Sequence, residues 1–129
     1  MTGRVWIVDD EPLIRAAVVA VLGEVGYEAT PLGSAEELYV RLVDGEAPPH
    51  LLILDQMLPD ESGDQIVRSL RERPQYRDIS VLFLTAVREE DAVRLADLAP
   101  VLTKPFDFRD LVEMVERLVS EAQSDETAG

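Results

Sequence analysis

The stretch that decides the fold is His50-Leu51-Leu52-Ile53-Leu54-Asp55, followed by the turn sequence Gln56-Met57-Leu58-Pro59-Asp60-Glu61-Ser62-Gly63. Its apolar run is typical of a buried strand, and a carboxylate closes it at Asp55. Three further apolar runs end in polar residues: Asp9 with Asp10, then Thr85, then Lys104 before a proline. Because ligands bind outside the carboxyl ends of the strands in an open parallel sheet, we expect these five side chains to converge on one pocket.

Strand and helix patterns alternate from one end of the chain to the other. The predicted strands are Val5–Val8, Tyr27–Leu32, Leu51–Leu54, Ser80–Thr85 and Val101–Thr103. The predicted helices cover residues 12–26, 34–45, 63–73, 89–98 and 107–119. Such alternation favours parallel βαβ units, which predicts an α/β fold with a doubly wound five-stranded parallel sheet and helices on both faces.

Local signals mark the ends of several helices. Ser34 and Glu37 have the spacing of a capping box, and Asp107 is placed to cap the last helix. From Ser120 onward the sequence becomes polar and small. We therefore expect residues 1–119 to form one domain, and residues 120–129 to be a frayed polar tail or the start of a linker.

The composition limits the class of protein. A chain of 129 residues is long enough for one domain with a core of ordinary size. It contains no cysteine, so disulfides and thiolate metal sites are excluded and any metal must be held by oxygen. The sequence shows no secretory leader pattern and no apolar run long enough to cross a bilayer, which makes the cytoplasm the expected location.

The chain is strongly acidic. Its formal net charge is −14, from 26 acidic residues against 12 Lys and Arg. Such a charge disfavours direct binding to nucleic acid or to an anionic membrane surface. We interpret most of the acids as solvated helix surface, whereas Asp9, Asp10 and Asp55 stand at strand ends.

The residues of the predicted pocket suit phosphoryl transfer. Three carboxylates in one pocket repel one another, and a hard divalent cation such as Mg²⁺ would keep them ionised. The expected ligands are Asp10, Asp55 and the backbone carbonyl of Met57. A carboxylate can also attack phosphorus and form an acyl phosphate, so Asp55 is the expected nucleophile. Lys104 and Thr85 would then neutralise and position the transferred oxygens.

Four motifs together resemble a known family. They are Val8-Asp9-Asp10-Glu11, Leu54-Asp55 with Met57, Pro59 and Gly63, Leu84-Thr85-Ala86, and Thr103-Lys104-Pro105-Phe106. In this order the chain resembles, over residues 4 to 119, the receiver domains of bacterial two-component response regulators. The resemblance implies a flavodoxin-like sheet with strand order 2-1-3-4-5, a cis peptide before Pro105, and Asp9 placed behind the residues that hold the metal.

The resemblance also implies a function. Asp55 would receive a phosphoryl group, with the help of Mg²⁺, from the phosphohistidine of a sensor histidine kinase or a phosphotransfer protein. The chain would then be a switch that acts on an effector domain or a downstream protein, and not an enzyme. In many receivers the surface of the fourth helix, fifth strand and fifth helix is the output or dimer face, so a homodimer is one expected assembly.

Three positions depart from the common pattern of that family or bear on its kinetics. An aromatic residue is typical three positions before the lysine, where this chain has Val101, which we expect to pack in the core. In the family, the side chains two residues beyond the phosphoacceptor and two beyond the threonine influence the access of water to the acyl phosphate. Here they are Met57 and Val87, which hydrogen-bond water poorly, so hydrolysis should be slow.

Other functions fit these residues less well. A phosphohydrolase of the haloacid-dehalogenase type needs a second Asp two residues after the nucleophile, and Met57 stands there. A flavin-binding module needs a phosphate loop after the first strand, where Asp9-Asp10-Glu11 would repel the flavin phosphate. A receiver-like scaffold that is never phosphorylated is a further alternative, although every pocket residue that the chemistry needs is present.

Overall fold

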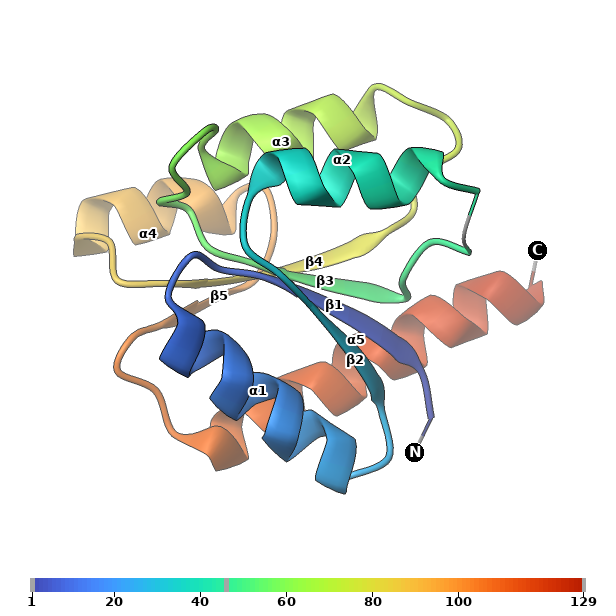
Figure 1. Ribbon diagram of the computed structural model, residues 1–129, viewed down its shortest axis with the longest axis horizontal. Helices are drawn as coiled ribbons and strands as arrows, with labels where there is room; N and C mark the ends of the chain where they lie inside the picture. Colours follow the sequence, from blue (N-terminus) through green and yellow to red (C-terminus); the bar gives the residue numbers. More distant parts are fainter. Residues whose placement is uncertain (1, 46, 129) are drawn as a thin grey trace.

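The computed structural model describes residues 2–45 and 47–128, and these residues form one twisted parallel sheet between two layers of helices (Figure 1). The strands are β1 (Arg4–Val8), β2 (Glu28–Leu32), β3 (Leu51–Leu54), β4 (Ser80–Thr85) and β5 (Val101–Thr103). Their order is β2-β1-β3-β4-β5, and each neighbouring pair is parallel. The predicted fold class and strand order are confirmed.

Helices cover both faces of the sheet. They are α1 (Pro12–Glu24), α2 (Ala35–Val43), α3 (Gly63–Arg71), α4 (Glu89–Ala96) and α5 (Phe108–Ala128). Figure 1 shows α2, α3 and α4 on one face and α1 and α5 on the other. The alternation of side chains along β1 explains the two layers: Val5 and Ile7 pack with α1 and α5, whereas Trp6 and Val8 pack with α2, α3 and α4.

The central strand β3 is buried on both faces. Leu51, Leu52 and Leu54 have no exposed surface, and Ile53 is 1 % exposed. Each such side chain contributes about 2 kcal/mol to folding through the apolar surface that it removes from water. A continuous apolar run, rather than an alternating one, is what a strand covered by helices on both faces requires.

The capping predictions hold in most details. The Ser34 hydroxyl accepts a hydrogen bond from the Glu37 amide at 3.2 Å, whereas the Glu37 carboxylate accepts from the Gly33 amide at 2.7 Å and from the Ser34 hydroxyl at 3.4 Å rather than from the Ser34 amide. The Asp107 carboxylate accepts from the Arg109 amide at 2.7 Å at the start of α5. The peptide between Lys104 and Pro105 is cis, as the resemblance implied.

Some boundaries differ from the predictions. Helix α1 ends at Glu24, and Gly26 adopts a φ of 101°, which favours glycine and ends the helix before β2. Helices α3 and α4 each end two residues earlier than predicted.

The prediction of a frayed end from Ser120 is wrong for the backbone, since α5 continues to Ala128. No proline or glycine interrupts residues 120–128, and the Gln123 side chain donates to the Thr2 carbonyl at 2.7 Å. This contact ties the end of the chain to its beginning. The boundary of the domain near residue 119 stays a prediction.

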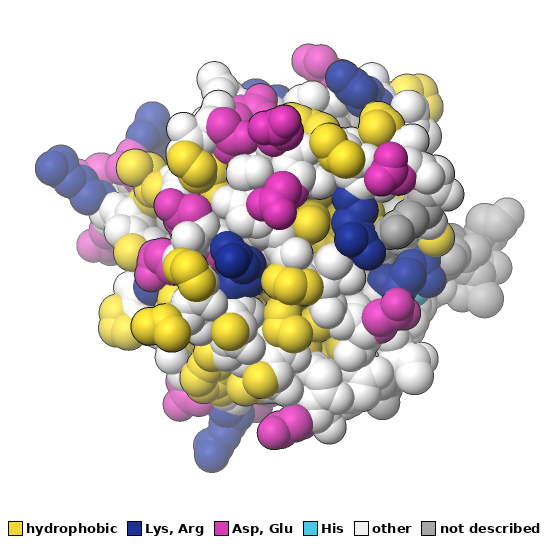
Figure 2. Space-filling view, in the orientation of Figure 1, with side chains coloured by type: hydrophobic (Ala, Val, Ile, Leu, Met, Phe, Trp, Pro, Cys, Tyr) yellow, Lys and Arg dark blue, Asp and Glu magenta, His cyan; other side chains and the backbone are white. Residues whose placement is uncertain are grey.

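The surface reflects the acidic composition. Figure 2 shows acidic side chains over much of this face, including the part that α2 occupies in Figure 1. Within residues 2–45 and 47–128, no helix is both long and apolar enough to cross a membrane.

Asp64 in the first turn of α3 gives a prediction about stability. Burial opposes its ionisation, but hydrogen bonds from Gln56, Ser62 and Arg68 outweigh burial and lower the pKa of Asp64 from 3.8 to about 2. The lowered pKa corresponds to about 2 kcal/mol, which we reduce to about 1 kcal/mol because the side chain is 24 % exposed. Asp64→Asn should lower the free energy of unfolding by about this amount at neutral pH, as measured by urea denaturation.

The sign of the pH dependence follows from the lowered pKa. The stabilisation by Asp64 is present above its unfolded value of 3.8 and is lost as the pH falls through the folded value of about 2. The difference between wild type and Asp64→Asn should therefore shrink over this interval. A difference that stayed constant down to the lower end of the interval would contradict the assignment.

Candidate functional site

The carboxyl ends of neighbouring strands bring the predicted residues to one edge of the sheet. Backbone hydrogen bonds continue past the strands there: the Asp55 amide donates to the Val8 carbonyl at 3.0 Å, and the Lys104 amide donates to the Thr85 carbonyl at 2.9 Å. The Asp9 amide donates in the same way to the carbonyl of Leu32, the last residue of β2. The sheet therefore sets the relative positions of these residues.

Buried carboxylates gather at this edge of the sheet. In the described part of the chain, the buried polar or charged residues are Asp9, Asp55 and Thr85, which are 1 %, 4 % and 0 % exposed. Burying a polar group costs free energy unless partners compensate for the lost water. Their concentration at the end of β1, β3 and β4 marks a functional site.

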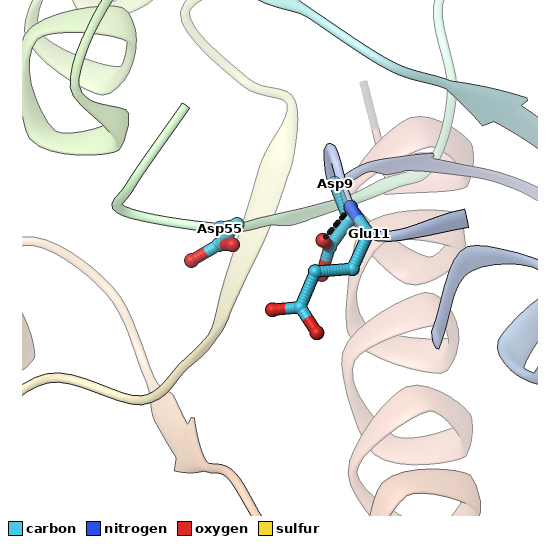
Figure 3. A group of neighbouring side chains, drawn as sticks. All are labelled: Asp9, Glu11 and Asp55. Atoms are coloured by element: carbon cyan, nitrogen blue, oxygen red, sulfur yellow. Dashed lines mark hydrogen bonds between the residues drawn. The ribbon is translucent and has the colours of Figure 1, made fainter. Parts of the chain in front are cut away.

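Lys104 lies among three carboxylates. Its Nζ is 2.8 Å from Asp9 Oδ2, 3.1 Å from Glu11 Oε1 and 3.5 Å from Asp55 Oδ2. One carboxylate oxygen from each acid lies within 4.8 Å of the others. Figure 3 shows Asp9 and Glu11 at one strand end and Asp55 at the neighbouring one, with the hydrogen bond from the Glu11 amide to Asp9 dashed. We name Asp9, Glu11 and Asp55 the acid cluster.

Burial and charge pairing act against each other at this site. Burial raises the pKa of Asp9 above 3.8, and its hydrogen bonds with Lys104 and the Glu11 amide oppose this only in part. Burial alone would lower the pKa of Lys104, but its hydrogen bonds to Asp9 and Glu11, together with the charge of Asp55, raise it above 10.5. The single amine stays protonated at neutral pH and faces three acids, so the pocket favours a further cation.

The Thr85 hydroxyl is unusual among the buried groups. Within the residues that the structure describes, its Oγ1 is buried and has no hydrogen-bond partner. A buried polar atom without a partner costs about 1–3 kcal/mol. The position of Thr85 at the end of β4 puts this residue at the same edge of the sheet as the acid cluster.

The loop between β3 and α3 holds Asp55 from the other side. The Met57 amide donates to Asp55 Oδ1 at 3.2 Å, and the Gly63 amide donates to the Gln56 carbonyl at 3.0 Å. A Cβ atom at Gly63 would lie 2.7 Å from the Asp55 carbonyl oxygen. Only glycine lets α3 start this close to the backbone of Asp55.

The structure brings together most, but not all, of the predicted site residues. Asp9, Asp55 and Lys104 are in contact, and Thr85 ends the strand next to β3. Asp10 is exposed and lies outside the acid cluster, so its role as a metal ligand stays a prediction.

Glu11 is the residue that the sequence analysis missed. Its amide donates to Asp9 Oδ1 at 2.9 Å, and its carboxylate lies 3.1 Å from the Lys104 amine. The signal available was its place directly after two strand-end aspartates, followed by a proline that starts α1.

Three apolar residues stand at positions that depart from the common receiver pattern or bear on acyl-phosphate hydrolysis. Val101 is partly buried against the core cluster on the side of α2, α3 and α4, which agrees with the expected packing. Met57 and Val87 line one cavity of about 270 Å³ together with residues of α3 and α4. The side chain of Met57 is 68 % exposed, so it stands at the surface beside the acid cluster.

Comparison with known sequences shows the family to which the chain is similar. Residues 5–116 match the family model of the response regulator receiver domain. The phosphate regulon transcriptional regulatory protein PhoB of Escherichia coli K12 is 34 % identical over 122 residues, which cover 92 % of this chain and 52 % of PhoB. The transcriptional regulatory protein AruR of Pseudomonas aeruginosa is 32 % identical over 127 residues, which cover 92 % of this chain and 50 % of AruR. The chain spans about half the length of these relatives.

Solved structures of receiver domains and response regulators have the same fold as this chain. The signal receiver domain of a histidine kinase from Syntrophus aciditrophicus superimposes with a TM-score of 0.81 at 30 % identity, and the match covers 92 % of this chain and 91 % of that one. A response regulator from Desulfuromonas acetoxidans gives a TM-score of 0.78 at 26 % identity, with 91 % and 96 % covered. The fold is the one expected, and the chain belongs to the response regulator receiver domain family of two-component signalling.

Proposed function

We propose that this chain is a phosphoacceptor switch in which Asp55 receives a phosphoryl group from the phosphohistidine of a sensor kinase or a phosphotransfer protein. The observation that carries the proposal is the setting of Asp55: a buried carboxylate, 3.5 Å from the Lys104 amine, in the acid cluster with Asp9 and Glu11. Membership of the receiver family supports the same reading.

The chemistry needs little beyond positioning and charge neutralisation. An oxygen of the Asp55 carboxylate attacks phosphorus, a P–O bond forms, and the P–N bond of the phosphohistidine breaks with its electron pair returning to the imidazole. The Lys104 ammonium neutralises charge on the transferred oxygens, and the Thr85 hydroxyl donates a hydrogen bond to one of them. The transferred group then stays on the chain as an acyl phosphate until it is hydrolysed, so the chain acts as a switch rather than an enzyme.

We propose Mg²⁺ as the cation of this pocket. The acid cluster offers only oxygen ligands and more negative than positive charge, which suits a hard divalent ion. The ligands that we propose are Asp10, Asp55 and the backbone carbonyl of Met57, with Asp9 behind them. When bound, the cation would neutralise charge on the phosphoryl oxygens.

The roles of Asp10 and Glu11 can be separated by substitution. Asp10→Asn should weaken Mg²⁺ binding at least about tenfold, because it removes a charged ligand. Glu11→Gln should weaken binding less, since its side chain is 57 % exposed and contacts Lys104. Calorimetric titration with Mg²⁺ measures both. If Glu11→Gln had the larger effect, Glu11 would replace Asp10 in the proposed ligand set.

The proposed function is tested by the intact mass of the protein after incubation with a small phosphodonor such as acetyl phosphate. One phosphoryl increment is expected with Mg²⁺ and none with EDTA. The increment should disappear in mild base or hydroxylamine, as an acyl phosphate does and a phosphoserine does not. Folded protein that gains no increment from either a small donor or phosphorylated kinase would favour the scaffold that is never phosphorylated.

The lifetime of the acyl phosphate should depend on Met57. Its thioether and the Val87 side chain line the same cavity and offer water no strong hydrogen bond. Met57→Asn should therefore speed the loss of the phosphoryl group severalfold, measured as the decay of the phosphorylated mass after the donor is removed. Met57→Leu is the matched apolar control and should decay like wild type. Equal decay of all three proteins would remove Met57 from the control of hydrolysis.

The partners that we propose follow from the same chemistry. A histidine kinase or phosphotransfer protein would supply the phosphoryl group, and an effector domain or a downstream protein would read it. The relatives PhoB and AruR are described as transcriptional regulatory proteins, and about half of each lies outside the match. The net charge of −14 makes direct binding of nucleic acid or membrane by this chain unfavourable. A homodimer and a cytoplasmic location complete the proposal.

A further inference from the structure

The loop between β3 and α3 is attached to the start of α2. Both carboxylate oxygens of Asp60 accept backbone hydrogen bonds there, from the Ala35 amide at 3.1 Å and from the Glu36 amide at 2.9 Å. These amides belong to the first turn of α2, which has no hydrogen-bond acceptors of its own for them. Figure 1 shows this loop beside the beginning of α2.

A second contact holds the same two segments together. The Tyr39 hydroxyl of α2 donates to the carboxylate of Glu61 at 2.7 Å, and the tyrosine is partly buried. Two consecutive loop residues therefore bind α2 through separate hydrogen bonds. We name residues 57–62 the metal loop, because Met57 provides the proposed backbone ligand.

The other end of the metal loop reaches Asp55. The Met57 amide donates to Asp55 Oδ1 at 3.2 Å, and Met57 forms an isolated bridge with Ser62. This bridge closes the loop on itself, so a shift of its tip changes the position of Met57. A hydrogen-bonded path of a few residues thus connects the phosphoacceptor to α2.

The start of α2 is also connected to the other acid-bearing strand. The carbonyl of Leu32, which ends β2, accepts a hydrogen bond from the Asp9 amide at 3.1 Å. Helix α2 begins three residues later, at Ala35. The first turn of α2 consequently lies between the segment that carries Asp9 and the loop that follows Asp55.

We propose that Asp60 is a positioning residue that couples the first turn of α2 to the metal site, so that cation and phosphoryl binding at Asp55 tighten this turn through Asp60, and the hydrogen bonds of Asp60 to the Ala35 and Glu36 amides tighten binding. The inference rests on the proposed function, since it needs the cation at the acid cluster. Coupling between two sites is reciprocal: each must change the free energy of the other by the same amount.

The first experiment measures Mg²⁺ affinity by calorimetry for wild type, Asp60→Ala and Ser34→Ala. Ser34→Ala is the matched control, because it removes another cap of α2, the hydrogen bond from the Glu37 amide to the Ser34 hydroxyl, and leaves the metal loop untouched. Asp60→Ala should weaken Mg²⁺ binding about fivefold, the lower end of typical coupling between sites. Ser34→Ala should bind Mg²⁺ like wild type.

The weaker Mg²⁺ binding expected for Asp60→Ala must not result from the loss of a negative charge alone. Glu36→Gln removes an exposed negative charge at the same end of α2 and keeps the backbone donors that bind Asp60. It should leave the affinity unchanged within a factor of about two at high salt, where exposed charges are screened. If Asp60→Ala is poorly folded by circular dichroism, Asp60→Asn replaces it, because the amide keeps one acceptor and should give a smaller loss in the same direction.

Hydrogen exchange tests the reverse direction. Addition of Mg²⁺ and a phosphodonor to wild type should slow exchange at the amides of Ala35 and Glu36, and the same addition to Asp60→Ala should not. Equal Mg²⁺ affinities for Asp60→Ala and wild type, or equal losses in Asp60→Ala and Ser34→Ala, would overturn the coupling. Wild type that binds no Mg²⁺ and gains no phosphoryl group would instead refute the proposed function, and the coupling with it.

Discussion

Asp55→Asn is expected to gain no phosphoryl group under conditions in which wild type gains one. The substitution keeps the size and shape of the side chain but replaces the nucleophilic carboxylate by an amide, which does not attack phosphorus at a useful rate. The loss should be complete because the described site offers no second acid in the same setting: Asp9 is held by Lys104 and by the Glu11 amide, and Glu11 is largely exposed. Intact mass after incubation with phosphodonor and Mg²⁺ measures the result.

The control for Asp55→Asn is an acid outside the pocket. Asp110→Asn removes an exposed carboxylate from the first turn of α5 and should gain a phosphoryl group like wild type. Circular dichroism should show both variants folded. An increment that persists in Asp55→Asn, located by peptide mapping on another residue, would move the acceptor and refute the assigned chemistry.

The fold was predictable because its signals are local. A continuous apolar run such as Leu51–Leu54 is typical of a strand covered on both faces, and the alternation of strand and helix patterns predicts helices on both sides of the sheet. The helix ends were less predictable, since no proline or glycine stops α5 at Ser120 and a contact with Thr2 supports its last part. Such a contact between the two ends of the chain has no local signal.

The site was predictable to the extent that it follows the strand ends. Topology places the ends of β1, β3, β4 and β5 at one edge, which predicts one pocket for the five strand-end residues Asp9, Asp10, Asp55, Thr85 and Lys104. The structure leaves Asp10 outside the acid cluster. The contact of Glu11 with Lys104 depends on a turn in which the Asp9 carboxylate binds the Glu11 amide. The contact of Asp60 with α2 spans 24 and 25 residues of sequence, and no spacing rule predicts it.

Val101 lies apart from the residues that suit phosphoryl transfer. Those residues follow or end β1, β3, β4 and β5, whereas Val101 begins β5 and packs against the core. A switch that relied on an inward-turning aromatic at that position would lack it here. The contacts of Asp60 and Glu61 with α2 offer a second route from the same pocket to the surface.

Lys104→Met is expected to have the largest effect on stability. Lys104 is the only lysine of the chain, its side chain is 9 % exposed, and its amine contacts all three residues of the acid cluster. Methionine keeps much of the apolar stem but removes the charge, so the buried Asp9 and Asp55 lose their counter-ion. Removing one partner of a buried ion pair costs about 3 kcal/mol or more, and urea denaturation without Mg²⁺ should show a loss of roughly that size.

The pH dependence of this loss follows from the acids. Burial already raises the pKa of Asp9 above 3.8, and removal of Lys104 takes away a contact that lowers it. An acid with a raised folded pKa destabilises the fold once the pH rises above its unfolded value, and protonation relieves the cost as the pH falls. The difference between wild type and Lys104→Met should therefore be largest at neutral pH and shrink in mild acid.

Mg²⁺ should act as a partial substitute for the lysine. A cation held by the acid cluster binds the folded state only, so saturating Mg²⁺ should stabilise Lys104→Met more than wild type, in which the amine already balances part of the charge. Arg109→Gln removes an exposed cation elsewhere and should respond to Mg²⁺ like wild type. If Mg²⁺ stabilised all three proteins equally, the amine and the metal would not share the acid cluster, and the roles assigned to Lys104 and to these carboxylates would be wrong together.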